Sequence, residues 1–505
     1  MQLFPKSLSI VLITICLFGF QSCKEKDTNP KPEHTISETG ENFRPEYHFT
    51  PEKNWMNDPN GLIFYQGYYH LFYQYYPDGN QWGPMHWGHA KSKDLVNWEH
   101  LPIALYPDNL GYIFSGSAVI DWKNTSRFGS ESNPAMVAIF THHDPVGAEK
   151  DANDFQYQSI AYSLDGGDTW TKFDGNPVLK NPGLKDFRDP KVFWDNASSQ
   201  WVMSLAVKDH VRFYGSSNLK DWEFLSEFGK DIGRHGGLWE CPDLFPMTDE
   251  AGQKKYVLLV SINPNGPQGG SATQYFIGDF NGKQFIPNDE KTRWVDYGAD
   301  NYAGVTFSNI PKEDGRRLFI GWMSNWQYAQ DVPTYNWRSA MTIPRSLILK
   351  KNSQGYFLQS KPIEELNQII GDSETISVTK KDINFKSYLI DLKIDKPIEF
   401  KLLNNKNEYL QVQLNDKEFV VDRTKSGITN FSINFPKVHR ATIDLDVICN
   451  LKMFVDASSI EIFINDGEFV FTDLIFPTEA YTVIESNAVY QLAKINPTKM
   501  TKNYE

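Results

Sequence analysis

Hydrophobic and polar residues alternate along much of the last third of the chain. In residues 390–394, 410–414 and 460–464, Ile, Leu or Val occupies every second position, and Asp, Lys or Gln fills the positions between them in the first two segments. A period of two predicts strands with one buried face. Several such strands in succession predict a β-sandwich over residues 371–505.

Residues 44–349 have a different texture, made of short aromatic and β-branched runs separated by Gly, Pro, Asn and Asp. This texture, without a long helical period, predicts an all-β domain. A turn of Ser, Asp, Asn or Gly followed by an aromatic residue recurs near 92–98, 163–170, 217–222 and 278–285. Its interval of roughly 50 to 70 residues is the size of a four-stranded propeller blade with its loops. We therefore predict a five-bladed β-propeller, in which residues distant in sequence can meet at a central channel.

The two domains are expected to be joined by a linker over residues 350–370. Ser-Lys-Pro at 360–362 is followed by Ile-Glu-Glu-Leu-Asn at 363–367, a pattern typical of a short helical turn between domains. Two domains also suit a chain of 505 residues, which exceeds the usual size of one domain.

The N-terminus has the pattern of an export signal. Lys6 is followed by an apolar run over residues 8–20, which is short for a membrane span, and then by Gln-Ser-Cys at 21–23. We predict that residues 1–22 are a signal peptide and that 23–43, polar and containing prolines, form a flexible tether. Because Cys23 falls where cleavage is expected, the segment resembles a bacterial lipoprotein signal with Cys23 lipidated. The protein would then be exported and anchored to a membrane; the alternative is an ordinary cleaved signal.

Composition and charge narrow the classes of partner. The net charge of −13 and the pI near 5.4 argue against a nucleic acid partner, which calls for a basic surface. Cys241 and Cys449 are the cysteines that follow the tether, so no disulfide scaffold is predicted. No Cys or His spacing indicates a metal site, and His-His-Asp at 142–144 is predicted to lie in a surface loop.

Three acidic residues stand close before prolines. Asp58 and Asp189 each precede a proline directly, and Glu240 precedes Pro242 by two positions. Because proline restricts the residue before it to extended geometry, we expect both aspartates to be held as strand-like residues. One Asp-Pro pair alone favours a turn. Three held acids together favour catalysis, since paired carboxyl groups are what glycosidases use.

The motifs around these acids resemble those of glycoside hydrolase family 32, the invertases, inulinases and levanases that split β-fructofuranosides. The resemblance covers nearly all of the chain after the tether. It rests on Trp-Met-Asn-Asp-Pro-Asn-Gly at 55–61, Phe-Ser-Gly-Ser at 114–117, Phe-Arg-Asp-Pro at 187–190, Trp-Glu-Cys-Pro-Asp at 239–243 and Asp-Ala-Ser-Ser-Ile-Glu at 456–461. The family implies a five-bladed propeller followed by a β-sandwich, in agreement with the texture of the sequence.

The resemblance also implies roles for the acids. Asp58 would be the nucleophile, Glu240 the general acid/base and Asp189 the stabiliser of the transition state. We expect Asp58, beside Asn57, to stay ionised and Glu240, between Trp239 and Cys241, to keep its proton in less polar company. Such a reaction needs no metal and no cofactor.

Seven further residues are expected to bind substrate: Asn57, Gln74, Trp82, Ser115, Arg188, Asp300 and Trp322. Of these, Gln74, Trp82, Ser115 and Trp322 match family positions that line the fructose pocket. Core packing is nearly as good an interpretation of the two tryptophans. Arg188 could equally be an ion-pair partner of Asp189.

Residues 296–304 and 321–328 look more like fructan-degrading members than sucrose-specialised ones. The sequence therefore predicts an exo-acting fructan β-fructosidase, a retaining enzyme that acts on levan or inulin and also on sucrose. The alternatives are an endo-levanase or endo-inulinase and a fructosyltransferase that uses the same acids. A non-catalytic fructan-binding propeller is disfavoured because Asp58 and Glu240 are both present.

Overall fold

The computed structural model describes residues 40–394, 396–415, 417–443 and 450–502. The signal peptide, the lipidation site Cys23 and most of the expected tether lie outside these ranges, as does Cys449. The all-β prediction is confirmed: strands dominate, and the few helices are short. These helices are η1 (Glu41–Phe43), α1 (Pro145–Glu149), η2 (Glu364–Gln368) and η4 (Asn465–Gly467). None of the described helices has the length and apolar character needed to cross a membrane.

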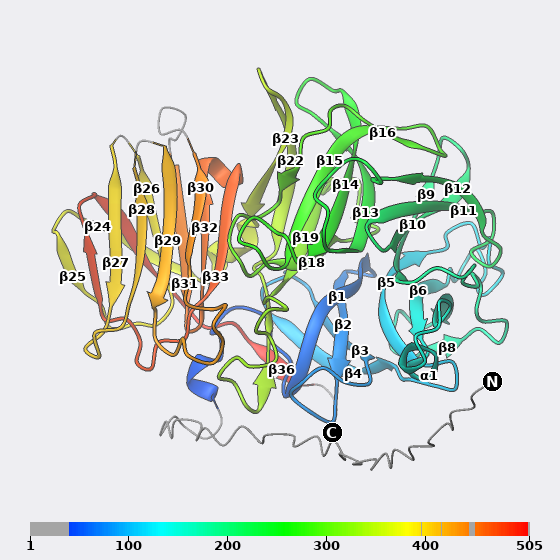
Figure 1. Ribbon diagram of the computed structural model, residues 1–505, viewed down its shortest axis with the longest axis horizontal. Coiled ribbons are helices and arrows are strands. Elements are labelled where there is room, and N and C mark those ends of the chain that lie inside the picture. The colour runs from blue at the N-terminus through cyan, green and yellow to red at the C-terminus, as the bar shows by residue number, and fades with distance from the viewer. Residues whose placement is uncertain (1–39, 395, 416, 444–449, 503–505) are drawn as a thin grey trace, which may run out of the picture. The chain divides into compact units, whose positions relative to one another are not determined.

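Five sheets, made mainly of antiparallel strands, follow one another along the first part of the described chain (Figure 1). The first contains β1 (Asn54–Tyr65), β2 (Tyr68–Tyr76), β3 (His86–Ser92) and β4 (Trp98–Leu105), and β20 (Trp337–Arg338) pairs in parallel with β1. The second contains β5 (Tyr112–Ile120), β6 (Met136–His143), β7 (Gln156–Ser163) and β8 (Thr171–Lys172). The third contains β9 (Phe187–Asp195), β10 (Gln200–Val207), β11 (His210–Ser216) and β12 (Glu223–Phe228).

The fourth sheet contains β13 (Leu238–Thr248), β14 (Lys254–Asn263), β15 (Ala272–Phe280), β16 (Phe285–Pro287) and β17 (Arg293–Trp294). The fifth contains β18 (Tyr302–Thr306), β19 (Arg317–Met323), β21 (Ala340–Met341), β22 (Arg345–Asn352) and β23 (Gly355–Pro362). The first strands of the sheets close a ring, because β1 contacts β5, β5 contacts β9, β9 contacts β13, β13 contacts β18 and β18 contacts β1. This is the arrangement of a propeller around a central channel.

Every one of these inner strands carries a register shift near its start. The shifts fall between Met56 and Pro59 in β1, between Ile113 and Gly116 in β5, between Glu240 and Asp243 in β13 and between Tyr302 and Val305 in β18, and β9 has one opposite Ser204 and Ala206 of β10. A β-bulge locally bends a strand and re-aims its side chains, and bulges are common beside active sites. The bulges explain how five inner strands can turn polar side chains toward one point.

The extended geometry expected of Asp189 is wrong. Its φ is 65°, in the left-handed region, and Cys241 in the corresponding bulge of β13 has a φ of 48°. Aspartate tolerates this region better than most residues. The bulge, with its ladder partners on β10, therefore overrides the local preference that Pro190 imposes on the residue before it.

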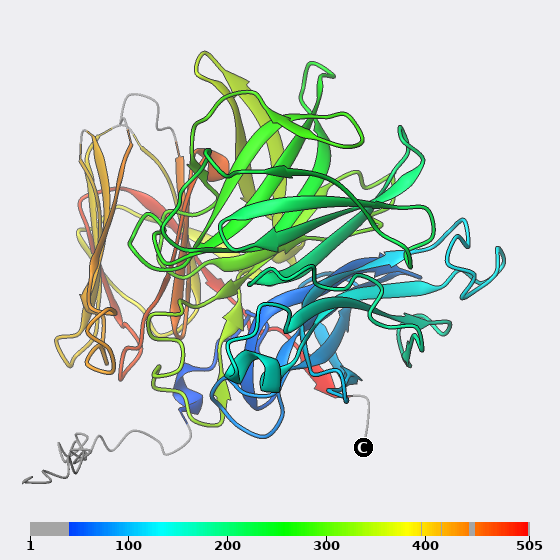
Figure 2. The ribbon, with the colours of Figure 1, turned by 45° about the vertical axis from the view of Figure 1, so that its right-hand side comes forward.

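The second domain consists of two six-stranded sheets, as the alternation predicted. One sheet contains β24 (Ile370–Ile376), β26 (Tyr388–Lys393), β31 (Asn450–Asp456), β32 (Ser459–Ile464), β33 (Phe469–Leu474) and β35 (Tyr490–Ile495). The other contains β25 (Lys380–Asp382), β27 (Ile398–Leu403), β28 (Tyr409–Leu414), β29 (Glu418–Lys425), β30 (Val438–Thr442) and β34 (Val483–Ser486). The alternating apolar residues of both sheets form one buried cluster between them. Figure 2 shows these two layers face to face, as in a sandwich.

The structure places the borders of the two domains differently from the sequence. Much of the expected linker, residues 350–370, belongs to the hairpin of β22 and β23, which completes the fifth sheet, and β24 of the sandwich already begins at Ile370. At the other end, β36 (Met500–Lys502) leaves the sandwich and pairs in parallel with β4. A hairpin and an edge pairing depend on partner strands, which local texture does not identify.

The end of the expected tether is also part of the folded body. Phe43 in η1 is fully buried and packs edge-on against Phe476, with ring centroids 5.4 Å apart. Burying an aromatic ring of this size is strongly favourable. The folded body therefore begins no later than η1.

Candidate active site

A cavity of about 390 Å³ opens at the end of the channel where the inner-strand bulges lie. Its lining comes from four of the five sheets, from α1 and from connecting loops: Asn57, Asp58, Gln74, Trp82, Phe114, Ser115, His143, Ala148, Phe155, Gln156, Asp186, Arg188, Asp189, Glu240, Trp326 and Gln330. The three acids singled out in the sequence thus meet in one pocket, although they come from β1, β9 and β13.

Asp58 is held by hydrogen bonds on both carboxylate oxygens. Ser115 Oγ donates to Oδ2 at 2.6 Å, and Asn57 Nδ2 donates to Oδ1 at 3.0 Å. The Cys241 thiol lies 3.5 Å from Oδ2. Asn57 is fixed in turn, because its Oδ1 accepts from Trp55 Nε1 at 2.7 Å. These donors favour the ionised form of Asp58 and orient it toward the cavity.

Asp189 is bound to the neighbouring blade. Its Oδ2 accepts from the backbone N–H of Cys241 at 3.0 Å, and its own N–H donates to Thr141 Oγ1 at 3.0 Å. The positive φ of Cys241 turns that N–H toward the channel, so the bulge of β13 supplies a donor to a carboxylate on β9. Asp189 is nearly fully buried.

Glu240 has a polar environment, contrary to the expectation from its sequence neighbours. Its Oε1 accepts from Arg188 Nε at 3.2 Å and from Arg188 Nη2 at 3.0 Å, and its Oε2 accepts from the Tyr302 hydroxyl. Trp239 lies in the apolar core behind the strand. Successive side chains of a strand point to opposite faces, so Trp239 points away from the carboxyl group of Glu240.

The charges in the pocket are strongly coupled. Burial, followed by the nearby charge of Glu240, raises the pKa of Asp58. Burial raises the pKa of Asp189 to about 7; the Arg188 guanidinium opposes this shift, and the charges of Glu240 and Asp58 add to it. Carboxyl groups this close resist ionising together. The pKa values of both Asp58 and Asp189 are therefore higher than those of exposed aspartates.

Arg188 joins the acids to the rest of the wall. Besides Glu240, it donates to Asp186 Oδ1 at 2.6 Å and to Gln156 Oε1 at 3.3 Å. Arg188 thus forms ion pairs with Asp186 and Glu240. Asp189, the partner expected from the sequence, acts on Arg188 through its nearby charge, which raises the pKa of the guanidinium. Gln74 is fixed by a bond from its Nε2 to the Ile113 carbonyl. Both residues lie in the pocket, as expected, and so does Trp82 at its rim, with 39% of its surface exposed.

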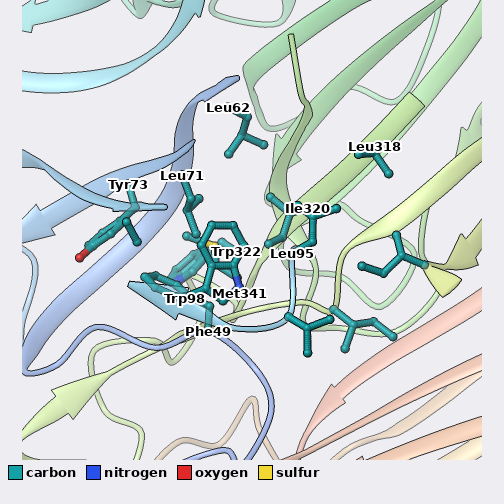
Figure 3. Close-up of a cluster of buried hydrophobic side chains, with 14 of the residues drawn as sticks. Phe49, Leu62, Leu71, Tyr73, Leu95, Trp98, Leu318, Ile320, Trp322 and Met341 are labelled. Carbon is teal, nitrogen blue, oxygen red and sulfur yellow. The ribbon is translucent and has the colours of Figure 1, made fainter. Parts of the chain in front are cut away.

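Two of the expected pocket residues do not line the cavity. Asp300 is fully buried in an ion pair with Arg423 of the sandwich. Trp322 is fully buried in the core of the first and fifth sheets, where Figure 3 shows it among Leu71, Ile320 and Met341. Its neighbour Trp326, whose ring centroid lies 4.9 Å away, lines the pocket instead. Sequence motifs locate both residues near the site, but they do not tell which side of a strand or turn faces the channel.

The structure adds functional candidates that sequence reasoning missed. His143 and Phe114 stack at the pocket wall, with centroids 4.2 Å apart. His-His-Asp at 142–144 is therefore not a surface loop: the two histidines end β6, and Asp144 caps α1. Phe114 and Trp326 stand inside segments already noted in the sequence, which was the available signal. Tyr302 is buried and reaches Glu240 from the fifth sheet, and no local pattern marks it as a partner of that acid.

No cluster of three or more His, Cys, Asp or Glu side chains suited to a metal ion is found among the described residues. The pocket chemistry is that of carboxyl groups with hydrogen-bond donors around them. Such a site can protonate a leaving oxygen, stabilise a developing cation and form a covalent ester.

Comparison with known proteins places the whole fold in one family. Residues 48–362 match the glycosyl hydrolases family 32 N-terminal domain, and residues 362–497 match the C-terminal domain of the same family. The chain is 49% identical over 470 residues to a levanase of Bacillus subtilis, covering 88% of this chain and 68% of that protein. It is 40% identical over 485 residues to an extracellular exo-inulinase of Aspergillus niger, covering 86% and 90%. The crystal structure of an exo-inulinase from Aspergillus awamori superposes with a TM-score of 0.84 at 35% identity, covering 92% of this chain and all of that one.

Proposed function

The chain belongs to glycosyl hydrolase family 32, and we propose that it is an exo-acting β-fructosidase that removes terminal fructose from levan or inulin, and also splits sucrose, with net retention. The glycosidase class follows from the family. The observation that carries the proposal is the meeting of Asp58, Asp189 and Glu240 in one pocket.

In the proposed mechanism Asp58 is the nucleophile. Departure of the leaving oxygen from the anomeric carbon of fructose leaves an oxocarbenium-like cation, which a carboxylate beside it stabilises and then captures as a covalent fructosyl ester. The hydrogen bonds from Ser115 and Asn57 favour the ionised form of Asp58 that this step needs and oppose the effect of burial, which raises its pKa. The ester preserves the configuration after a second displacement by water.

Glu240 is the proposed acid/base. It gives its proton to the leaving oxygen in the first step and, once ionised, takes a proton from water in the second. Arg188 and Tyr302 donate to its two oxygens and stabilise the charge that appears when the proton leaves. The proposed cycle therefore begins with the proton on Glu240.

Asp189 is the proposed stabiliser of the transition state. It is buried, and the Cys241 N–H fixes its Oδ2, which leaves the other oxygen, Oδ1, for sugar hydroxyls. Hydrogen bonds to hydroxyls of the reacting ring strengthen as the cation develops. We place Asn57, Gln74, Trp82, Ser115 and Arg188 around the same sugar, and Asp300 and Trp322 behind the wall.

Exo action is supported by the depth of the site. The three acids are buried or half-buried, whereas Trp82 at the rim is well exposed. A chain end can enter such a pocket more easily than the middle of a polymer. The name of one relative, the exo-inulinase of Aspergillus niger, agrees with this choice.

One experiment tests the proposal: incubation of the protein with levan, inulin and sucrose separately, followed by separation of the products by size. Free fructose as the first and main product from either fructan supports exo hydrolysis. A ladder of oligomers from a fructan would indicate endo action in place of exo action. Longer oligosaccharides made from concentrated sucrose would indicate a transferase. No product from any of the three would refute the assignment.

We further propose that the protein is exported and anchored to a bacterial membrane, on its periplasmic side or at the cell surface, through a lipid on Cys23. The relative from Aspergillus niger is an extracellular enzyme, which supports export. The anchor rests on the sequence of residues 1–30 alone. Metabolic labelling with a fatty acid tests it: the wild-type chain takes up label and fractionates with membranes, and a Cys23→Ser chain does neither. Equal labelling of the two chains would refute the proposal that Cys23 carries a lipid.

A further inference from the structure

The segment that leads into Tyr302 lies along the edge strand of the sandwich. The N–H of Tyr297 donates to the Val470 carbonyl at 2.7 Å, and the N–H of Asp300 donates to the Thr472 carbonyl at 3.0 Å. Both acceptors belong to β33. The contact continues on the side-chain level, because the N–H of Leu474 donates to Asp300 Oδ2 at 2.8 Å. The second domain therefore holds the residues directly before an active-site tyrosine.

Arg423, on β29, reinforces this contact from inside the sandwich. Its Nη1 donates to Asp300 Oδ2 at 2.6 Å, and its Nη2 donates to the Tyr328 hydroxyl at 2.8 Å. Tyr328 in turn donates to Asp300 Oδ1 at 2.6 Å, which closes a ring of three side chains. All three are almost fully buried. The Nε of Arg423 is bound to the Phe435 carbonyl, so the guanidinium plane is fixed at several points.

The two segments that Arg423 joins both reach the active site. Asp300 is two residues before Tyr302, whose hydroxyl donates to Glu240. Tyr328 belongs to a turn closed by its own N–H on the Asn325 carbonyl at 3.0 Å, and this turn carries Trp326, a pocket-lining residue. The turn is also tied to the first segment, since Asn325 Nδ2 donates to the Ala299 carbonyl at 2.7 Å.

We propose that Arg423 is a positioning residue for hydrolysis: through Asp300 and Tyr328 it sets the place of Tyr302 against Glu240 and of Trp326 along the pocket. The inference rests on the proposed function and gives the sandwich a part in it. Arginine suits the task because its rigid planar fork can bind two partners at fixed angles, which a lysine cannot do. Arg423 touches neither substrate nor the reacting atoms.

Loss of the Arg423 contacts should impair mainly the step in which Glu240 donates its proton. Tyr302 holds one oxygen of Glu240, and a misplacement of a catalytic group by about 1 Å from a distant change can cost ~100-fold in rate. A loosened Tyr302 leaves Glu240 less well aimed at the leaving oxygen. Substrates with a poor leaving group depend on that proton, whereas an activated aryl fructoside does not.

The test compares the full-length wild type with Arg423→Met on sucrose and on nitrophenyl β-fructofuranoside. We expect kcat on sucrose to fall ~10-fold to ~100-fold, with a smaller change in KM, and kcat on the aryl fructoside to fall several times less. Arg423→Lys keeps the charge but not the fork and should recover only part of the loss. A merely structural role would lower the folded fraction and reduce both substrates by the same factor.

Two further variants keep the test decisive. Tyr328→Phe removes one hydroxyl from the ring of contacts and leaves Arg423 paired with Asp300, so it serves if Arg423→Met does not fold; it should shift the ratio of the two substrates in the same direction by a smaller factor. His48→Gln is the matched control, because the hydrogen bonds of the His48 ring go to Asp456 and Glu461 in the same domain interface and not to residues 300–302 or 325–330. It should lower stability and leave the substrate ratio unchanged.

The route through Tyr302 is tested by a double-mutant cycle. If Arg423 acts on leaving-group dependence through Tyr302, the change in substrate ratio caused by Arg423→Met should shrink in a Tyr302→Phe background. Full additivity, or equal losses on both substrates in Arg423→Met or Tyr328→Phe, would overturn the inference while leaving the proposed function in place. A wild-type chain that releases no fructose would instead overturn the proposed function, and the inference with it.

Discussion

The hydrogen bond from Ser115 to Asp58 should favour the ionised form of Asp58, and its removal should change the pH dependence of the reaction. Ser115 Oγ lies 2.6 Å from Asp58 Oδ2, shorter than the 3.0 Å from Asn57 to the other oxygen. Ser115 is buried, and Asp58 is half-buried. Replacing Ser115 by Ala removes the shortest hydrogen bond to Asp58, the proposed nucleophile, and leaves the others in place.

The size of the effect comes from the charge on the acceptor. A hydrogen bond to an ionised group contributes ~1.5 to 3 kcal/mol. Burial and the charge of Glu240 already raise the pKa of Asp58, and loss of the Ser115 donor pushes it further in the same direction. Because the nucleophile works only when ionised, kcat/KM at acid pH should fall ~10-fold, and the acid limb of its pH profile should move up by about one unit.

The assay is kcat/KM on sucrose across the acid and neutral range for the wild type and Ser115→Ala. Ser117→Ala is the matched control: it lies on the same strand and is buried, but its hydroxyl donates to the Pro190 carbonyl and contacts no carboxylate. It should lose stability without moving the acid limb. An unmoved limb in Ser115→Ala, with a uniform loss at every pH, would show that Ser115 orders the pocket and does not tune Asp58.

Four other outcomes are expected. Asp58→Asn should abolish turnover and leave the fold intact by circular dichroism; substantial remaining hydrolysis would remove the nucleophile assignment. Glu240→Gln should slow sucrose far more than an activated aryl fructoside, and equal losses would argue against an acid role. Although burial lowers it, hydrogen bonds with Asp456 and Glu461 raise the pKa of His48 to about 9. The protonated His48, bound to the two acids, should stabilise the fold below about pH 6.5 by roughly 3 kcal/mol, and this contribution should be lost as the pH rises through about 9. An unfolding free energy that stays constant between these pH values would contradict the prediction. A chain ending at residue 362 should be unstable and weakly active, since the sandwich holds two buried ion-pair sites of the propeller, and a stable, fully active propeller would refute this.

The acid motifs can be recognised in the sequence because they are local. Strand-forming runs and the Asp-Pro and Glu-Cys-Pro segments stand within a few residues of one another, and five ordered motifs point to one family. The sandwich is recognisable for the same reason, since alternation with a period of two marks a strand wherever it packs. The amino-acid sequence alone is therefore enough to predict the fold class, the family and the three acids.

Partners across the molecule cannot be predicted in this way. The contact of Tyr302 with Glu240 joins residues 62 positions apart, and that of Arg423 with Asp300 joins residues 123 apart. Neither pair shares a local pattern, which is why the sequence places Asp300 in the pocket and does not mark Tyr302. The sequence also predicts, wrongly, that Glu240 lies in apolar surroundings, and the reason is the same. Its sequence neighbour Trp239 points to the opposite face of the strand, and the residues that contact its carboxyl group come from other sheets.

The sequence by itself determined the all-β fold class, the family and which carboxyl groups are available for chemistry. The tertiary structure alone decided what surrounds those groups: which donors bind each carboxyl group, which tryptophan of residues 322–326 lines the pocket, and where one domain ends and the next begins. The physical reason is that burial and electrostatics depend on distances in space, and the closed ring of β1, β5, β9, β13 and β18 creates those distances only after all five sheets have assembled.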